Sequence, residues 1–328
     1  MNTHNEEKFF DAIEDTIKKA RGNDACLFPN CNRKPTGSHI IAHRTLKDIA
    51  DNKFQVLTWS PQNINTFQMS KSLKAGQPLE KLFEEPIPVH ITAKNRMKYP
   101  IFCKYHDNNV FAPLENRGFS FQPEQFVLLA FRAFCSMIFS LLEMEAILSA
   151  VVNQHSFQRS LGTQEDLSKL QRFQATEVFL QGRQRYEQIL SSKDYDQLEC
   201  LPYQVNIQPS IATTNSLFPA VDATAIINGA QGLTVEDAVS FSFLPYKSMN
   251  NSICVISFLR GSQGAQRFKD LYKIDELTEN EQQDLFLTFA FESPTIYISP
   301  TWWYSLSEEK RGEYKKIHLD VYRSQEGF

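Results

Sequence analysis

Two short motifs of cysteine and histidine restrict the folding of this chain more than any other part of its sequence. Cys26 and Cys31 enclose four residues, and Cys103 and His106, much further along, enclose two. Structural zinc sites hold a tetrahedral ion with four such ligands, contributed as two short pairs that folding brings together. The spacing therefore predicts that Cys26, Cys31, Cys103 and His106 bind one structural Zn²⁺ ion.

The residues around the two pairs predict a treble-clef arrangement. Leu27 to Asn30 can form a tight turn that points both sulfurs of the first pair inward, and the spacing from Cys103 to His106 suits the first turn of a helix. A hairpin containing His39 would lie between them. Two alternatives stay open: either His39 replaces His106 as the fourth ligand, or the first pair consists of ordinary surface thiols and His106 is a polar surface residue.

The remaining composition is that of a folded protein inside a cell. Hydrophobic residues make up 42% and charged residues 22% of the chain, which excludes a disordered protein. Six cysteines among 328 residues are not a disulfide framework, and Cys135, Cys200 and Cys254 lie in apolar surroundings typical of inert core thiols. The N-terminus lacks a secretory signal, and no apolar run reaches the roughly 20 residues that span a bilayer. We therefore expect a cytoplasmic protein with no membrane partner.

Hydrophobic patterning divides the chain into three parts and predicts an α+β fold. Residues 1–118 form the zinc-binding treble-clef domain. Residues 119–200 form a central antiparallel helical hairpin, with one amphipathic helix near 124–151 and a second from Thr163 or Gln164 to Leu190. Residues 201–328 form an α+β domain with a mainly antiparallel sheet.

In the last part, short segments rich in β-branched and aromatic residues are separated by turn residues. One helix near Ser262 to Tyr272 interrupts them. Residues 60–98 show little periodicity and are interpreted as an insertion loop with one short helix near Leu79 to Phe83. The predicted strands are QVNIQPSI, AIING, AVSFSFLPY, SICVISFL, LFLTFAFE and TIYISP.

The region around the two pairs resembles a known family. Its motifs are Gly37-Ser38-His39-Ile40-Ile41, then Phe102-Cys103-x2-His106-Asp107, followed by Phe111 and Glu115. This order is similar to the treble-clef zinc module of HNH endonucleases. It looks like a group of uncharacterised bacterial proteins, some of them found in phage-defence neighbourhoods. The resemblance covers residues 20–118 and does not extend to the rest of the chain.

The resemblance implies a candidate catalytic site. In the family, a hairpin histidine activates water and a divalent metal ion stabilises the departing phosphate charge. His39 matches that histidine, Asp107 would be a metal ligand or its neighbour, and the cation would be Mg²⁺ or Mn²⁺. The chain also departs from the family, because Ser38 replaces the acidic residue or histidine before the base and Val110 or Phe111 replaces the final histidine. The module is thus degenerate, and the alternative is that His39 only forms hydrogen bonds within the hairpin.

Basic residues near both pairs are candidates for phosphate contact. The formal net charge of the chain is −4, which excludes a protein that coats nucleic acid by its overall charge. If the fold joins the local basic clusters, they form a positive face for DNA or RNA. The candidate residues are Arg33, Lys34, Arg44 and Lys104.

Three functional hypotheses follow. The first is a zinc-binding, nucleic-acid-associated bacterial protein, an anti-phage defence component whose degenerate HNH-like nuclease module either cuts or only binds. The second is a non-catalytic protein in which zinc stabilises a scaffold and the helical hairpin contacts a protein partner or a second copy. The third is an enzyme whose site lies in the C-terminal domain without a recognisable motif.

Overall fold

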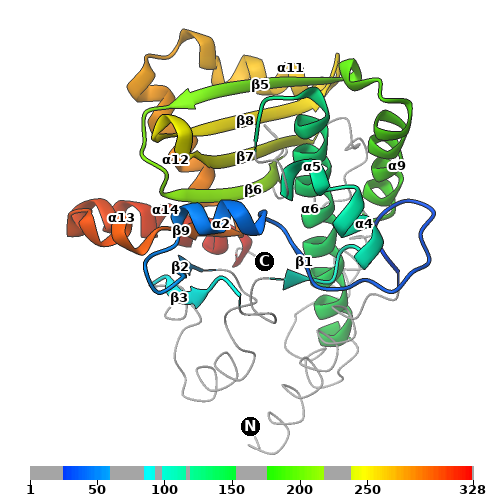
Figure 1. The fold of residues 1–328 in the computed structure, drawn as a ribbon, viewed down its shortest axis with the longest axis horizontal. Coiled ribbons are helices and arrows are strands. Elements are labelled where there is room, and N and C mark those ends of the chain that lie inside the picture. Colours follow the sequence, from blue (N-terminus) through cyan, green and yellow to red (C-terminus); the bar gives the residue numbers. More distant parts are fainter. Residues whose placement is uncertain are drawn as a thin grey trace, which may run out of the picture.

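The computed structural model describes residues 25–59, 85–92, 98–115, 119–152, 176–217 and 238–326. In this part of the chain, helices pack on both faces of a seven-stranded antiparallel sheet, so the predicted α+β class is confirmed (Figure 1). None of the helices in the described ranges is long and apolar enough to cross a membrane. The helix predicted near 79–83 and the AIING strand lie outside the described residues.

The main sheet takes its strands from both ends of the described chain. They are β2 (Gln55–Thr58), β3 (Ile87–His90), β5 (Leu198–Val205), β6 (Ile211–Leu217), β7 (Val239–Tyr246), β8 (Asn251–Leu259) and β9 (Ile296–Ile298). Their order is β3-β2-β9-β6-β7-β8-β5, and each neighbouring pair is antiparallel. The short β9 joins the two parts of the sheet, because Leu57 of β2 and Ile211 of β6 both pair with Ile298.

One face of the sheet is covered by α2 (His43–Ile49) and the long helix α6 (Pro123–Val152), with α9 (Thr176–Ser192) packed beside α6. Apolar side chains recur around α6 and are buried on both its sides, because it contacts the sheet and α9. Phe131 and Phe134 of α6 both contact the ring of Tyr186 on α9. Two packed helices therefore occupy the region predicted as a hairpin. The part of the second predicted helix at 163–175 lies outside the described residues.

The opposite face is covered by α11 (Gln263–Tyr272), α12 (Glu279–Glu292), α13 (Pro300–Ser305) and α14 (Glu308–Glu326). Ser262 begins α11 by accepting a hydrogen bond from the Ala265 amide at 3.1 Å, so the helix predicted there is confirmed. Thr278 and Glu281 form a capping box at the start of α12.

A small two-stranded sheet positions the candidate site. It pairs β1 (Ser38–His39) with β4 (Lys98–Tyr99), and the short helices α4 (Lys104–Asn109) and α5 (Ala112–Glu115) follow β4 and lead towards α6. In Figure 1 this unit lies beside α6, on the face of the main sheet that α6 covers.

Three sequence interpretations are wrong in these regions. LFLTFAFE is the second half of α12 rather than a strand, because apolar residues on several sides of this buried helix hide its period. QVNIQPSI is mainly the connection between β5 and β6. The predicted loop at 60–98 contains β3 and part of β4, and β3 was missed because a short edge strand with a proline has a weak signal.

The main sheet extends across the predicted limits at 118/119 and 200/201. Strands β2 and β3 come from residues 1–118, and β5 begins at Leu198. The first and last parts of the described chain therefore share one sheet.

Candidate metal centre

The four predicted ligand residues lie together in the structure. One ligand atom from each of Cys26, Cys31, Cys103 and His106 lies within 4.8 Å of all the others. In the described part of the chain, this is the only group of three or more cysteine, histidine or acidic residues with such geometry, and His39 is not a member. The arrangement can hold a metal ion.

The distances within the cluster fit a tetrahedral ion. The sulfurs of Cys31 and Cys103 are 3.9 Å apart, while His106 Nδ1 lies 3.3 Å from the Cys26 sulfur and 3.5 Å from the Cys103 sulfur. With zinc bonds of about 2.3 Å to sulfur and about 2.0 Å to nitrogen, a tetrahedron separates two sulfurs by about 3.8 Å and sulfur from nitrogen by about 3.5 Å. The cluster therefore has dimensions compatible with zinc.

The first pair of ligands lies on a tight turn held by backbone hydrogen bonds. The Cys31 amide donates to the Phe28 carbonyl at 3.2 Å, and the Cys26 amide donates to the Arg33 carbonyl at 2.9 Å. Asn30 has a left-handed backbone, with φ of 57°, which asparagine tolerates better than most residues. The turn expected from the sequence is present, and it directs both sulfurs towards the cluster.

The second pair lies at the start of α4. Cys103 is the N-cap of this helix and His106 follows in its first turn, in agreement with the two-residue spacing. The amides of Cys103 and Phe28 donate to the Cys26 sulfur at 3.2 and 3.4 Å. Hydrogen bonds of this kind stabilise a thiolate relative to a thiol, which favours metal binding.

Burial and hydrogen bonds shift the pKa values of the cluster residues in different directions. Burial raises the pKa of Cys26 to about 12, although neighbouring amides act in the opposite direction. Burial also acts to raise the pKa of Cys103, but hydrogen bonds from the His106 backbone and the Cys31 side chain outweigh it, and this pKa is lowered. Burial and then Arg33 lower the pKa of His106, which keeps the imidazole neutral and able to act as a ligand. A bound cation would let the buried Cys26 ionise.

The cluster is part of a large hydrophobic core. Cys26 and Cys103 are buried in the same core as the apolar face of α6. Phe28 stacks on the ring of His106, with centroids 3.9 Å apart, and meets Phe131 of α6 edge to face at 5.9 Å. Phe28 of the cysteine turn therefore connects the cluster to α6.

The two candidate catalytic residues lie outside the cluster. His39 is half-buried in β1, with its ring centroid 5.5 Å from that of His43. Asp107 is half-buried in α4, and its amide donates to the Cys103 carbonyl at 2.9 Å. Ser38 is buried and its hydroxyl donates to the Phe102 carbonyl at 3.3 Å, so this residue fastens the hairpin to the second ligand pair.

Sequence reasoning missed a buried ion pair beside the module. Arg132 of α6 is only 2% exposed, and it donates to Glu115 of α5 at 2.9 Å while its guanidinium lies 4.2 Å from the ring centroid of Phe111. The second oxygen of Glu115 accepts from the His43 amide at 3.3 Å, at the start of α2. A single arginine in a long apolar helix gives no signal of its partner, so only the fold reveals this link between α2, α5 and α6.

The predicted phosphate-binding residues fall into two groups. Arg33, Lys34 and Lys104 are exposed on the two segments that carry the ligand pairs. Arg44 is exposed on α2, which packs against β6 and β7. The Arg33 guanidinium lies 4.9 Å from the ring centroid of Tyr105, a residue that the sequence-based site did not include. The first group is therefore exposed beside the two ligand pairs in the sequence.

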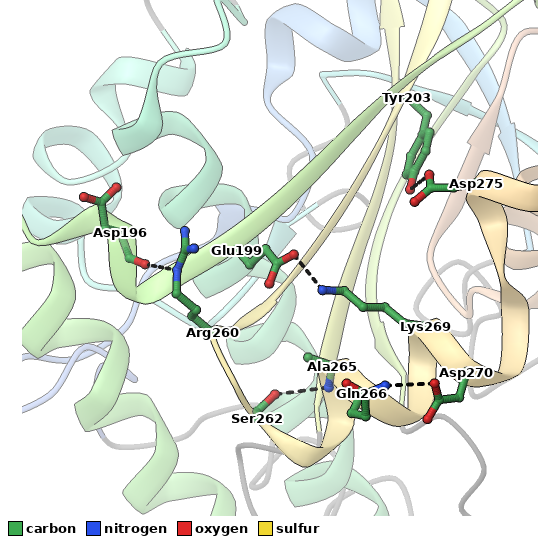
Figure 2. Close-up of polar contacts among 10 residues, drawn as sticks. All are labelled: Asp196, Glu199, Tyr203, Arg260, Ser262, Ala265, Gln266, Lys269, Asp270 and Asp275. Carbon is green, nitrogen blue, oxygen red and sulfur yellow. Dashed lines mark hydrogen bonds and ion pairs between the residues drawn. The ribbon is translucent and has the colours of Figure 1, made fainter.

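A second polar region lies along the edge strand β5. It has hollows of about 330 and 360 Å³, one beside the turn before α11 and the other between β5 and α11. Figure 2 shows that charged side chains here are bonded to neighbours, so they fasten α11 and its preceding turn to β5. The contacts are Lys269 to Glu199 at 2.8 Å, Tyr203 to Asp275 at 3.3 Å, and Arg260 to the Asp196 carbonyl at 2.6 Å.

No family profile, no curated protein and no solved structure matches this chain. Its function therefore has to be argued from the site itself.

Proposed function

We propose that the chain binds one structural Zn²⁺ ion through Cys26, Cys31, Cys103 and His106, in a treble-clef module, and that this module binds nucleic acid. The donor set and its distances support zinc, since three cysteines and one histidine suit a tetrahedral ion with no open position. Zinc so bound has a structural role, and it joins the cysteine turn to the start of α4.

One observation carries the nucleic-acid part of the proposal. The exposed residues of 25–37 and 104–109 contain three cations, an aromatic ring and several amides, but no carboxylate. The single acidic residue of these two segments, Asp107, is half-buried. One carboxylate of another element contacts these segments, because Glu187 of α9 accepts a hydrogen bond from Asn30 at 3.5 Å. The exposed charged and aromatic residues of the two segments are Arg33, Lys34, Lys104 and Tyr105; we call these four residues the carboxylate-free surface.

This surface differs in sign from the chain as a whole, whose formal charge is −4. A local positive face of this kind attracts phosphates even when the net charge does not. With three cations, the logarithm of the binding constant should fall with the logarithm of salt concentration with a slope of roughly −2 to −3. Binding should therefore be moderate and strongly salt-dependent.

The zinc part is tested by elemental analysis of purified chain. Wild type should contain one zinc per chain, and Cys103→Ala should lose it and lose roughly 4 kcal/mol or more of stability, because the free energy of zinc binding no longer stabilises the folded state. Cys200→Ala, at a cysteine outside the cluster, and His39→Ala should retain the metal. Full zinc in Cys103→Ala would refute the assigned ligand set.

The nucleic-acid part is tested by fluorescence anisotropy with labelled oligonucleotides at several salt concentrations. The triple variant Arg33→Ala, Lys34→Ala, Lys104→Ala should weaken binding at least tenfold and flatten the salt dependence. The charge-matched control removes Lys53, Lys247 and Lys273, which are exposed elsewhere. Equal loss in both triple variants, or no binding by wild type, would contradict the proposal.

A plasmid-nicking assay with Mg²⁺ or Mn²⁺ separates binding from cleavage. Nicking that His39→Ala abolishes would assign hydrolysis to the module, with His39 as the general base. Binding without nicking would show that the module binds nucleic acid but does not cleave it. Both results are consistent with the proposed binding function.

A further inference from the structure

Tyr105 is an exposed aromatic residue within the carboxylate-free surface. Its side chain is 54% exposed, although it lies on α4 directly between the metal ligands Cys103 and His106. Large exposed apolar side chains elsewhere in the described chain, such as Phe54 and Tyr304, lie away from this surface in the sequence. Burying such a ring against a partner would be favourable, and its neighbours indicate which partner.

The ring of Tyr105 is held in place by charged and metal-linked neighbours. The Arg33 guanidinium lies 4.9 Å from its centroid, and the His106 ring meets it at 5.3 Å with an interplanar angle of 71°. His106 is itself held by the metal cluster and by Phe28 stacked on it. The backbone carbonyl of Tyr105 accepts a hydrogen bond from Asn109 at 2.9 Å. An aromatic ring beside a guanidinium, both prearranged, matches a platform on which a nucleic-acid base can stack.

The short length of α4 argues against the recognition of base pairs in double-stranded nucleic acid. Helices that read double-stranded DNA enter the major groove and place several side chains against base edges. The six residues of α4 extend only about 9 Å, and both the N-cap residue Cys103 and one of the six, His106, are committed to the metal cluster. Three cations also supply little phosphate attraction, so useful affinity needs a second contribution. Stacking of an unpaired base supplies it, and duplex bases are not available for this.

We propose that the carboxylate-free surface binds single-stranded nucleic acid, with one unpaired base stacked on Tyr105 beside Arg33. This inference rests on the proposed function, and it names the class of nucleic acid. Lys34 and Lys104 contact the flanking phosphates. The recognised chemistry is an exposed base next to a phosphate, which single-stranded DNA and single-stranded RNA share.

The test uses zinc-loaded full-length chain and three labelled probes of equal length: oligo-dT, oligo-U and a mixed-sequence DNA duplex. Binding to one or both single strands should be at least tenfold tighter than to the duplex. Tyr105→Ala should weaken single-strand binding roughly 5- to 100-fold, whereas Tyr105→Phe, which keeps the ring, should bind within about twofold of wild type. Tyr304→Ala, which removes a tyrosine that is 63% exposed on α13, is the matched control and should bind like wild type.

Zinc content and far-UV circular dichroism show that each variant is folded, and the comparison of single strand with duplex in the wild type keeps the inference testable if the alanine variant loses its metal. Equal affinity for single strand and duplex would overturn the inference, and so would an unchanged Tyr105→Ala. In both cases the loss seen in the Arg33, Lys34 and Lys104 triple variant would still support nucleic-acid binding. Absence of binding to all three probes would instead overturn the proposed function. The dT and U arms assign the ligand to DNA, RNA or both.

Discussion

At the scale of single residues, the buried pair of Arg132 and Glu115 shows how a charge can serve the architecture around a metal site. Arg132 is almost completely buried, whereas Glu115 is 25% exposed and also accepts from the His43 amide. An arginine of this kind needs its partner, because an unpaired buried charge is far more costly than the pair is favourable. The pair therefore fixes the relative positions of α2, α5 and α6 more than it adds stability.

Glu115→Ala should destabilise the protein by roughly 2–4 kcal/mol, since it leaves Arg132 buried without an anion. Arg132→Met should cost clearly less, because a flexible apolar side chain can occupy the space over Phe111 and leaves only a partly exposed carboxylate. Urea denaturation of the two variants measures the difference. If Arg132→Met is as damaging as Glu115→Ala, the argument from unpaired charge is wrong.

His318 on α14 makes stability depend on pH. It is 1% exposed, its Nδ1 atom bonds the Phe291 carbonyl at 2.8 Å, and burial lowers its pKa to about 4. The unfolded chain binds this proton below about pH 6.5, whereas the folded chain resists it until about pH 4. The contribution of neutral His318 to the free energy of unfolding should therefore be fully present above pH 6.5. This free energy should fall by roughly 3 kcal/mol as the pH drops from 6.5 to 4.

His318→Leu removes this titration. The variant should be less stable at pH 7.5, because the Phe291 carbonyl loses its donor, but the difference from wild type should shrink as the pH falls to 4.5. Urea midpoints at several pH values measure it, and His90→Ala, at an exposed histidine, is the control. A difference that stays constant with pH would show that His318 does not titrate as stated. Loss of metal at low pH affects all three proteins alike and cancels.

For single residues, the sequence predicts the members of the cysteine and histidine cluster but not the contacts between side chains from distant segments. The clustering of the four candidate ligands was predictable, because zinc chemistry requires four such residues and the two short spacings fix the local geometry of each pair. The neighbours of Tyr105 and Arg132 were not, because they come from other segments of the chain. The contact of Arg33 with Tyr105 exists only after folding has brought the two segments of the ligand cluster together.

At the scale of elements, the edges of the main sheet carry prolines where a missing N–H does no harm. The Arg260 amide donates to the Gln197 carbonyl, and antiparallel strands alternate between residues that bond the neighbour and residues that do not. Continuing this alternation along β5, the nitrogen of Pro202 faces away from β8. Pro88 of the other edge strand, β3, follows the same rule. Prolines placed in this way block the pairing of exposed edges with another chain.

Pro202→Val restores an outward N–H group on the exposed edge strand β5. It also raises the β-propensity of this strand. We expect concentration-dependent self-association, measured by light scattering after size exclusion, with little change in the unfolding midpoint. Gln204→Val is the matched control, since it adds the same side chain at another outward-facing position but leaves Pro202 in place. Association of both variants would implicate apolarity rather than the restored donor, and association of neither would show that the edge is protected by other means.

The errors in predicting elements have a physical pattern. The helices α6 and α11 were predicted because an apolar face or an N-cap is visible locally. The second half of α12 is misassigned as a strand because its residues from Leu285 to Phe291 are apolar except for Thr288, although the capping box at Thr278 and Glu281 is present in the sequence. Burial on several sides removed the helical period, and the local cap was the better guide.

At the scale of the whole molecule, one core connects the metal centre to the sheet. The core that contains Cys26 and Cys103 continues through α6 to residues of β5 and β8, such as Leu198 and Val255. The Ser240 hydroxyl of β7 donates to the Ala130 carbonyl of α6 at 3.2 Å, which fastens this helix to the sheet. Composition changes along the sequence suggested three parts, but they could not show that β2 pairs with β9. The continuity predicts that metal binding stabilises the whole described unit.

Removal of the metal should therefore lower the unfolding midpoint of the sheet as well as that of the zinc module. The three tryptophans of the chain, Trp59, Trp302 and Trp303, are all buried in the core on the face opposite α6, so their fluorescence reports on a region away from the metal centre. Treatment with a strong zinc chelator should shift the thermal midpoint down by roughly 5–15 °C, in tryptophan fluorescence and far-UV circular dichroism alike. A single shared transition means that the metal and the sheet fold as one unit. An unmoved tryptophan transition with a separate, lower transition in circular dichroism would mean that the zinc module unfolds by itself, and the shared core would then not transmit the stability of the metal site.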